Sequence, residues 1–279
     1  MIGIFDSGIG GLSVLREIYR LLPEENYIYY ADSAHCPYGE KSREYVTDRA
    51  RTISEFLIKE GAGIIVVACN TATAAAISTL RKDYSYCPSG TGRVMEISGG
   101  RYGHVSFIGM EPAVKPAAEM TRSGVIGVLA TAGTLNGLKY KTTREMWAKG
   151  IKVVEHVGKG FVNLVEQGIT DGPEAERTVE ESVRPLVDAG ADTIVLGCTH
   201  YPFLADTIQK VAGPDVNLID PAPAVARHLL DVMGEEGLLS GEKGGKPEIR
   251  LMSSGDSRVL RMLAGRLGIP GTQFCPTCP

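Results

Sequence analysis

The sequence predicts an α/β fold of two similar domains, each with a central parallel sheet flanked by helices. Short apolar runs rich in β-branched residues alternate with longer amphipathic stretches. The short runs are continuously apolar, as expected for strands that are covered on both faces. One unit of the pattern also occurs twice. We therefore expect two domains related by a pseudo-twofold axis, with the active site in the cleft between them.

The alternation divides the chain into expected strands and helices. The strands are expected at 2–5, 27–30, 63–68, 105–108, 125–129, 152–155, 193–196, 216–219 and 248–252. The helices are expected at 12–22, 42–59, 71–82, 135–148, 173–188 and 222–233. The regular succession of strand and helix favours parallel sheets with helical crossovers.

The internal repeat is centred on two cysteines, each of which is expected to end a buried strand and to open a helix. Residues 63–71 (GIIVVACNT) resemble residues 193–200 (TIVLGCTH). An acid-Pro turn follows each unit, at Glu111-Pro112 and at Asp220-Pro221. If these turns are crossovers, residues 1–112 and 220–279 form the first domain and residues 113–219 the second. The first copy carries surplus residues at about 86–104, rich in Gly and Ser, which predict a surface loop or hairpin.

Composition restricts the possible functions. The 279 residues are 43% apolar and 22% charged, with a net charge of -4, so nothing in the composition supports nucleic-acid binding. The apolar runs are too short to span a bilayer. Met1 leads directly into a strand-like run, without the basic and apolar regions of a secretory signal. We expect a cytoplasmic protein with no nucleic-acid or membrane partner.

Six cysteines are present, and in a reducing compartment we expect free thiols. Cys275 and Cys278 have the spacing of a redox or half-zinc motif. No second CxxC completes that motif, so a frayed, inert tail is expected. Cys87 has no evident partner.

The two repeated cysteines admit two interpretations. A buried strand cysteine is usually a small hydrophobic core residue. Here polar residues come directly afterwards, Asn70 and Thr71 after Cys69 and Thr199 and His200 after Cys198. Such residues suit helix capping, and they also suit anion binding at a helix N-terminus. The helix dipole there is expected to lower the thiol pKa from about 8.5.

Two further segments could line a pocket. The turn 6–11 (DSGIGG) follows a strand and precedes a helix, but it has neither dinucleotide-binding spacing nor a P-loop lysine. Ser7 could donate to a carboxylate, and Asp6 is either a structural cap or a group that manages a nearby proton. Tyr38 and Gly39 belong to a Cys-Pro-Tyr-Gly segment that is typical of a loop and could also lie at a pocket rim.

These segments, taken together, closely resemble glutamate racemase, of the cofactor-independent aspartate/glutamate racemase superfamily. The resemblance runs over nearly the whole chain, in order. It is carried by residues 5–12 (FDSGIGGL), Ala31-Asp32 with 37–39 (PYG), 68–72 (ACNTA) and 197–202 (GCTHYP).

The resemblance implies roles for the matched positions. Cys69 and Cys198 would be the two proton-transfer groups, Asp6 would assist Cys69, and His200 with Glu166 would assist Cys198. On an amphipathic helix a lone Glu is more often a solvated residue, and a lone His can be a core or capping residue. The implied substrate-binding residues are Ser7, Tyr38, Gly39, Asn70, Thr71, Thr134 and Thr199.

The implied function is racemisation of L-glutamate to D-glutamate for peptidoglycan, by two-base proton transfer without a cofactor or a metal. Removal of the α-proton leaves a carbanion. Without a cofactor, this carbanion must be stabilised by N–H and hydroxyl donors in a cleft that excludes water. The expected partners are glutamate and a second copy of the chain in a homodimer. The alternatives are a related racemase acting on aspartate or another amino acid, a non-catalytic amino-acid-binding protein of the same fold, and a thiol hydrolase or redox enzyme with one nucleophilic cysteine.

Overall fold

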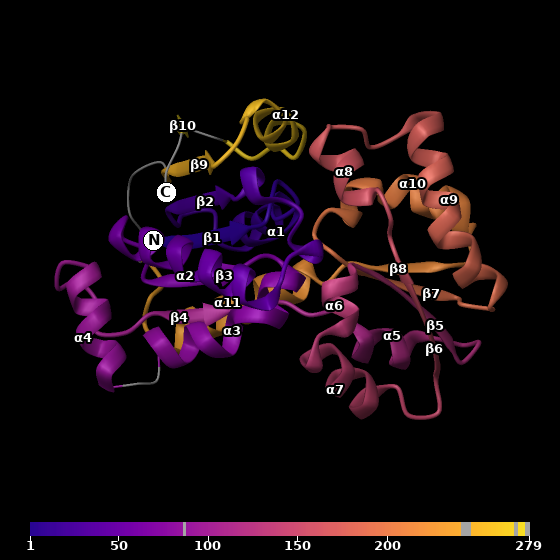
Figure 1. The fold of residues 1–279 in the computed structure, drawn as a ribbon, viewed down its shortest axis with the longest axis horizontal. Coiled ribbons are helices and arrows are strands. Elements are labelled where there is room, and N and C mark those ends of the chain that lie inside the picture. The colour runs from indigo at the N-terminus through magenta and orange to yellow at the C-terminus, as the bar shows by residue number, and fades with distance from the viewer. Residues whose placement is uncertain (86–87, 241–246, 271–272, 277–279) are drawn as a thin grey trace.

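The computed structural model describes residues 1–85, 88–240, 247–270 and 273–276, and the side chains of all of these except 88–91 and 273–276. Two sheets made only of parallel strands lie side by side, with helices around each (Figure 1). The predicted α/β fold with two parallel sheets flanked by helices is therefore confirmed.

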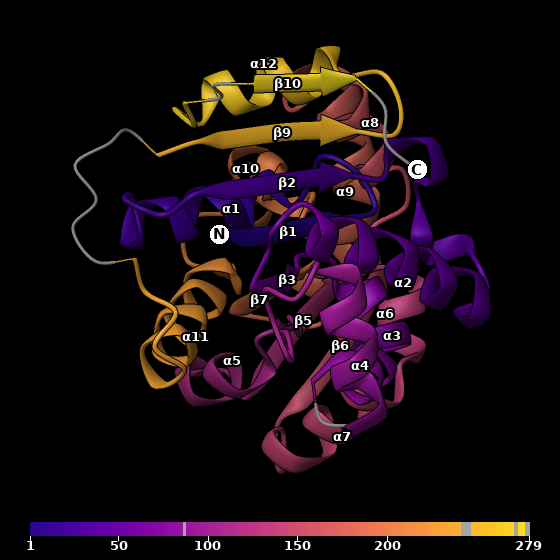
Figure 2. The same ribbon diagram turned by 90° about the vertical axis from the view of Figure 1, so that its left-hand side faces the viewer.

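The first sheet combines the beginning of the chain with its end. Its strands are β1 (Ile2–Asp6), β2 (Tyr27–Ala31), β3 (Ile64–Val67), β4 (Ser106–Ile108), β9 (Ile249–Ser253) and β10 (Gln273–Pro276). They are arranged in the order β10-β9-β2-β1-β3-β4. Figure 2 shows β9 and β10 continuing the sheet beyond β2.

Both faces of this sheet are buried, and successive strand residues pack on opposite faces. Ile4 and Tyr29 pack in one core with helices α1 (Leu12–Leu21), α11 (Ala222–Glu235) and α12 (Arg258–Arg266). Phe5 and Tyr30 pack in another core with helices α2 (Arg43–Lys59), α3 (Asn70–Tyr84) and α4 (Pro88–Ile97). This double coverage accounts for the continuously apolar strands.

The second sheet is continuous in the sequence. Its strands are β5 (Val125–Ala130), β6 (Lys152–Val157), β7 (Thr193–Gly197) and β8 (Asn217–Ile219), in the order β6-β5-β7-β8. Val128 packs with α5 (Val114–Met120) and α7 (Leu138–Trp147). Leu129 packs in the core that contains α9 (Gly172–Asp188) and α10 (Ala205–Ala212).

The two sheets share one topological feature that positions the site. In the first sheet β1 lies between β2 and β3, and in the second β5 lies between β6 and β7. In each sheet the chain therefore runs first to one side of a central strand and then to the other. Ligands of parallel α/β sheets bind beyond the carboxyl ends of the strands at such a reversal. Cys69 follows β3 and Cys198 follows β7, so each cysteine lies at its sheet's reversal point.

The predicted loop or hairpin at 86–104 is wrong over most of its length. Residues 88–97 form α4, while 86–87, including Cys87, lie outside the described residues. Val94 is fully buried against α2 and α3, and Arg93 pairs with Glu55 of α2 at 2.9 Å. This tertiary packing outweighs the low helix propensity of the glycines in the segment.

Other elements also depart from expectation. The helix expected at 135–148 is two helices, α6 (Ala132–Asn136) and α7, because Gly137 has extended backbone between them. The short helices α5, α8 (Phe161–Glu166), α10 and α12 and the strand β10 were not predicted. The frayed tail expected at Cys275 to Cys278 is wrong for 275–276, which pair with β9 as part of β10. The side chain of Cys275 and all of Cys278 lie outside the described residues.

In the described part of the chain, no helix is both long and apolar enough to cross a membrane. The division into domains at 112 and 220 stays a prediction. The sheets themselves take strands from 2–108 with 249–276 and from 125–219.

Candidate active site

One cavity collects side chains from the carboxyl ends of both sheets. Its room is about 10 Å³, roughly that of a single water molecule. Every predicted site residue except Asp6 and Glu166 contributes to its wall, and those two lie directly behind it. The wall consists of Ser7, Pro37, Tyr38, Gly39, Cys69, Asn70, Thr71, Thr131, Thr134, Val162, Cys198, Thr199 and His200.

Asp6 ends β1 and holds the following turn together. Its carboxylate accepts hydrogen bonds from the backbone N–H groups of Ser7 at 2.7 Å and Gly11 at 2.6 Å. The Thr199 hydroxyl, from the second sheet, donates to the same carboxylate at 3.2 Å. Complete burial raises the pKa of Asp6 above its ordinary value, although the nearby His200 charge and the two N–H groups oppose that rise. The cap and the proton-managing interpretations of Asp6 are therefore compatible.

Cys69 is the N-cap residue of α3, as the sequence predicted. Its sulfur accepts from the Ala72 N–H at 3.4 Å, and its thiol donates to Ser7 Oγ at 3.7 Å. The Ser7 hydroxyl in turn donates to Asp6 at 3.3 Å. Ser7 thus connects the thiol to the carboxylate.

The expected lowering of the Cys69 pKa by the helix N-terminus is wrong. Burial, reinforced by the Asp6 charge, raises the pKa of this thiol, and the Ala72 N–H opposes the rise only in part. Desolvation outweighs the helix terminus because the sulfur lies in the interior. A cationic group brought into the cavity would lower this pKa again.

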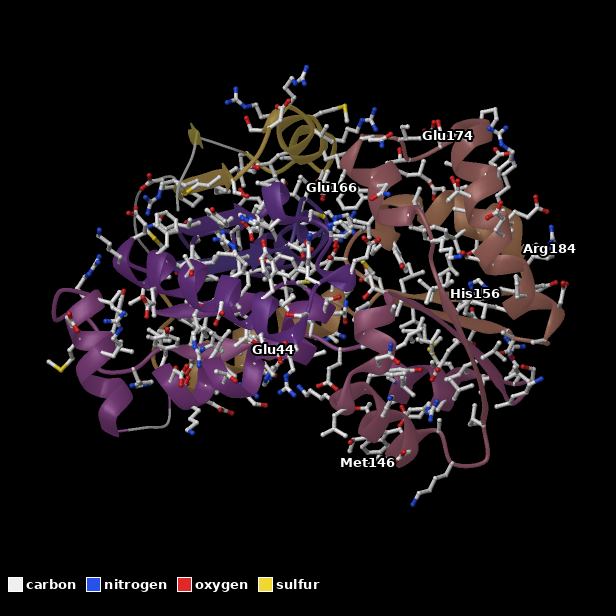
Figure 3. The ribbon with its side chains drawn as sticks, in the orientation of Figure 1. Glu44, Met146, His156, Glu166, Glu174 and Arg184 are labelled. Atoms are coloured by element: carbon white, nitrogen blue, oxygen red, sulfur yellow. The ribbon has the colours of Figure 1, made fainter. Side chains whose placement is uncertain are left out.

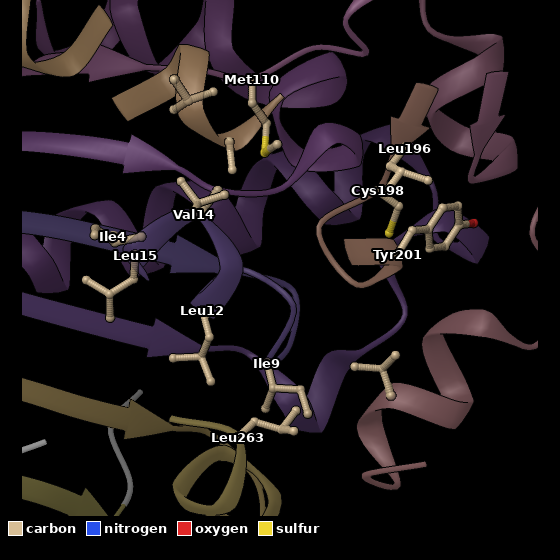
Figure 4. Packing of buried hydrophobic residues seen from close by; sticks show 14 of the residues in the cluster. Ile4, Ile9, Leu12, Val14, Leu15, Met110, Leu196, Cys198, Tyr201 and Leu263 are labelled. Atoms are coloured by element: carbon tan, nitrogen blue, oxygen red, sulfur yellow. The ribbon is translucent and has the colours of Figure 1, made fainter. Parts of the chain in front are cut away.

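Cys198 differs from Cys69 in its local structure. No α-helix begins at Cys198; a turn leads into a short 3₁₀ helix, η3 (Tyr201–Leu204), and α10 starts only at Ala205. Pro202 has no backbone N–H with which to extend helical bonding back toward the cysteine. Figure 4 shows Cys198 and Tyr201 just beyond β7. The two cysteine units are thus equivalent in strand topology, but the segments after the two cysteines differ.

His200 and Glu166 stand behind Cys198. The sulfur of Cys198 lies 3.7 Å from His200 Nδ1, and His200 Nε2 lies 2.7 Å from Glu166 Oε1. Burial alone lowers the pKa of His200, but hydrogen bonds to Cys198, Cys36 and Glu166 raise it well above its ordinary value. The imidazole is therefore a proton donor suited to Cys198. Figure 3 labels Glu166 on α8, near the junction of the two sheets.

The glycines of the first turn are explained by this pair. The backbone N–H of Ile9 donates to Glu166 Oε1 at 2.7 Å. A Cβ atom on Gly8 would overlap the Glu166 carboxylate, and one on Gly10 would overlap the His200 ring. The turn therefore needs glycine so that the two halves of the molecule can approach.

Further hydrogen-bonding groups line the cavity wall. Neither amide atom of Asn70 has a hydrogen-bond partner among the described residues, although both are buried. The hydroxyls of Thr71, Thr131 and Thr134 lie 2.9 to 3.4 Å from one another. An unpaired buried amide is costly, and a ligand carboxylate or ammonium would satisfy it.

Tyr38 is held by a neighbouring ion pair. Its hydroxyl donates to Asp32 at 2.6 Å, and Arg49 binds the same carboxylate through two nitrogens at 2.8 and 3.0 Å. The ring is thus fixed at the cavity wall with its hydroxyl turned to Asp32.

The sequence assigned no site role to Thr131, Val162, Pro37 or Cys36. Thr131 directly follows β5 and could have been found as a polar residue at the end of a central strand. The sequence predicted only that Cys36 lies in a loop. Among the described residues, one group of side chains could hold a metal ion: Cys36, Glu166 and His200.

The fold and the cavity define an α/β protein of the amino-acid racemase class. A model of the Asp/Glu/Hydantoin racemase family matches residues 2–229, and the chain belongs to this family.

Relatives that are 43–45% identical to the chain are glutamate racemases. The chain is 44% identical to glutamate racemase of Roseiflexus sp. over 269 residues, 96% of this chain and 92% of the relative. Among solved structures, glutamate racemase RacE1 of Bacillus anthracis matches with a TM-score of 0.83 and 31% identity, covering 100% of this chain and 97% of that one. Glutamate racemase of Francisella tularensis in complex with D-glutamate matches with a TM-score of 0.78 and 29% identity, over 99% and 97% of the two chains. The predicted resemblance and the predicted kind of enzyme are confirmed.

Proposed function

We propose that this enzyme interconverts L- and D-glutamate by proton transfer between the substrate α-carbon and two cysteines, Cys69 and Cys198. The observation that carries the proposal is that the two thiols, one from the carboxyl end of each sheet, line the same cavity. The D-glutamate complex of the Francisella relative supports glutamate as the substrate.

The reaction needs one thiolate and one thiol at a time. The thiolate on one face takes the α-proton, the electron pair of the C–H bond passes to the α-carbon and its carboxylate, and the thiol on the other face returns a proton to the carbon. The two thiols then exchange states for the reverse reaction. Acid-base catalysis of this kind is most effective when the thiol pKa lies near the working pH. Substrate ammonium would offset the burial that raises the Cys69 pKa.

Each thiol has its own route for proton exchange. Cys69 is connected through Ser7 to Asp6, whose raised pKa suits it to hold a proton for part of the cycle. Cys198 is connected through His200 to Glu166. We propose these as the positioning and proton-storing groups of the two halves.

The substrate would be held by Ser7, Asn70, Thr71, Thr134 and Thr199, with Tyr38 and Gly39 at the cavity wall. Glutamate would need a wider cavity than the present one, which has room for about one water molecule. The Asn70 amide, unpaired among the described residues, supports this role. Hydroxyl and amide donors aimed at the α-carboxylate would stabilise the carbanion as its charge develops. Thr131 joins the set, since it lies in hydrogen-bonding reach of both Thr71 and Thr134.

The wider context is proposed as well. The enzyme would act in the cytoplasm without a cofactor and supply D-glutamate for peptidoglycan. It would function as a homodimer of two-domain subunits, divided near 112 and 220. Two exposed apolar side chains of α7, Leu138 and Met146, would be available for a contact between subunits. Analytical ultracentrifugation of the purified protein tests the dimer.

A direct assay tests the function. Purified protein, dialysed against a chelator and given no cofactor, should convert L-glutamate to a racemic mixture, followed by circular dichroism. L-Aspartate and other L-amino acids serve as comparisons. Faster turnover of L-aspartate would identify a related aspartate racemase instead. If none of the tested amino acids lost its optical activity, the result would favour the non-catalytic amino-acid-binding protein.

A further inference from the structure

A cluster of three potential metal ligands lies beside the substrate cavity. The Cys36 sulfur, a Glu166 carboxylate oxygen and a His200 ring nitrogen all lie within 4.8 Å of one another. The three residues come from separate segments: Cys36 follows η1 (Ser33–His35), Glu166 ends α8 and His200 follows β7. The fold itself therefore assembles the cluster.

The donor set and the spacing suit zinc. Thiolate, imidazole and carboxylate are the three ligand types that Zn²⁺ binds in proteins, at about 2.3 Å for sulfur and about 2.0–2.2 Å for nitrogen and oxygen. Ligand atoms of a tetrahedral site are then roughly 3.3–3.8 Å apart. The sulfur needs to move inward only slightly, and the 2.7 Å hydrogen bond between His200 and Glu166 has to open by less than about 1 Å.

The cluster can be reached without passing the substrate. A groove of about 690 Å³ on the outer side is lined by Ser33, Ala34, Glu166, Gln167, Gly255, Asp256, Arg258, Val259 and Met262. Glu166 lies in the wall of this groove, whereas His200 lies in the wall of the substrate cavity. Glu166 contacts His200 at 2.7 Å, so this residue connects the groove to the inner end of the cluster.

We propose that Cys36, Glu166 and His200 bind Zn²⁺ and that the bound ion inhibits the enzyme. On binding, the Cys36 thiol releases its proton to solvent and its sulfur bonds to the metal. His200 gives up its contact with Glu166, releases the Nε2 proton to solvent and bonds to the metal through Nε2. The ring can then no longer pass a proton between Glu166 and Cys198. The inhibition, though not the binding, rests on the proposed function.

Cobalt spectroscopy tests the binding directly. Co²⁺ replaces Zn²⁺ as a coloured probe, and a thiolate ligand gives a charge-transfer band in the near ultraviolet. The full chain carrying Cys87→Ser, Cys275→Ser and Cys278→Ser is titrated with Co²⁺, which limits the thiols to Cys36, Cys69 and Cys198. We expect the band to form, and Zn²⁺ to abolish it by competition.

Variants in the same background decide which residues bind. Cys36→Ser should abolish the charge-transfer band and weaken Zn²⁺ binding by at least about 10–100-fold, the loss found for disturbing even outer-shell partners of a metal site. Asp256→Asn is the matched control: it removes a carboxylate of the same groove, and the band should remain. A band that survives Cys36→Ser, or one that disappears with Cys198→Ala instead, would overturn the proposed site.

Inhibition is measured separately, at free Zn²⁺ set by a metal buffer because glutamate itself chelates zinc. Each variant is compared with its own rate in chelator. The wild type should lose activity as the free Zn²⁺ concentration rises. Cys36→Ser should need an at least about 10-fold higher Zn²⁺ concentration for the same fractional loss of activity. Equal sensitivity of the wild type and Cys36→Ser to Zn²⁺ would overturn the proposal that zinc inhibits the enzyme at this site. If the protein shows no racemase activity at all, the proposed function fails while the cobalt result still decides the site.

Discussion

His200 and Glu166 come from different parts of the chain and meet at 2.7 Å, behind Cys198, which follows β7. The other ring nitrogen of His200 lies 3.7 Å from that cysteine's sulfur. The backbone N–H of Ile9 donates to the same Glu166 oxygen, so a turn of the first sheet fixes the acid-base partner of the second. The two cysteines thus have different hydrogen-bond networks, and the hydrogen bond from Ile9 to Glu166 joins the two halves of the site.

Replacing either thiol should divide the reaction into its halves. Cys69→Ser and Cys198→Ser should each lower racemisation by about 10²–10⁴-fold or more, the range of general acid-base contributions. Each variant should retain partial exchange of the α-hydrogen with one enantiomer, because the remaining thiol still faces the α-carbon. Loss of α-deuterium, followed by NMR for L- and D-glutamate separately, measures this. Cys87→Ser is the control, and wild-type turnover in both active-site variants would refute the two-thiol mechanism.

Asn70→Ala should weaken substrate binding without weakening the fold. Its amide is buried without a hydrogen-bond partner among the described residues, so removing it relieves a desolvation cost instead of breaking a bond. We expect KM to rise about 10-fold or more while the free energy of unfolding stays equal or increases. Urea unfolding and steady-state kinetics measure the two. Asn163→Ala, at an exposed position of α8, should change neither. A marked loss of stability in Asn70→Ala would show that the amide has a structural role.

Gly10→Ala should damage stability and activity together. The added methyl group would overlap the His200 ring, and relieving such a clash in a packed interior costs about 1–3 kcal/mol. Because the ring must shift away from Cys198, kcat should fall as well. Gly265→Ala in α12 is the matched control, since a Cβ there meets nothing within 4 Å and helix propensity should add about 1 kcal/mol of stability. Equal behaviour of the two variants would argue against close packing of turn and ring.

The pH dependence of stability should report His200 and its hydrogen bonds to Cys198, Cys36 and Glu166. The folded pKa of His200 lies above its ordinary value, so the folded state holds more protons than the unfolded state between these two values. Stability from this group is complete below the unfolded pKa and is lost as pH rises through the folded pKa, by at most about 1.4 kcal/mol per pH unit.

Glu166→Gln should lower the His200 pKa and move that loss of stability to lower pH. Imidazole NMR titration and urea unfolding across pH 6 to 9 measure both effects. Glu174→Gln, at an exposed position of α9 that is labelled in Figure 3, is the control. An unchanged imidazole titration in Glu166→Gln would contradict the assigned cause.

The sequence was sufficient for every strand except β10 and for most of the cavity wall. Buried strands such as 64–67 are short, apolar and β-branched, so their local pattern is unambiguous. Strand ends are equally visible, and parallel sheets place those ends together. The sequence alone therefore groups Cys69, Asn70, Cys198 and Thr199.

Features that depend on tertiary contacts could not be predicted from the sequence pattern. Residues 88–97 are Gly- and Ser-rich, yet they are helical because Val94 is buried and Arg93 pairs with α2. The pKa of Cys69 depends on its depth and on Asp6, and neither appears in a sequence pattern. Cys36 lies far along the chain from Glu166 and His200, so no spacing rule links the three.

The order of strands along the chain has a consequence for synthesis on the ribosome. The four strands of the second sheet, 125–219, leave the ribosome together, and that sheet has all of its strands while the first still lacks two. Strand β2 keeps an unpaired edge until 249–253 emerges, near the end of translation. An unpaired strand edge can pair with another chain. The nascent protein is therefore most prone to aggregation, and most in need of a chaperone, before 249–253 has emerged.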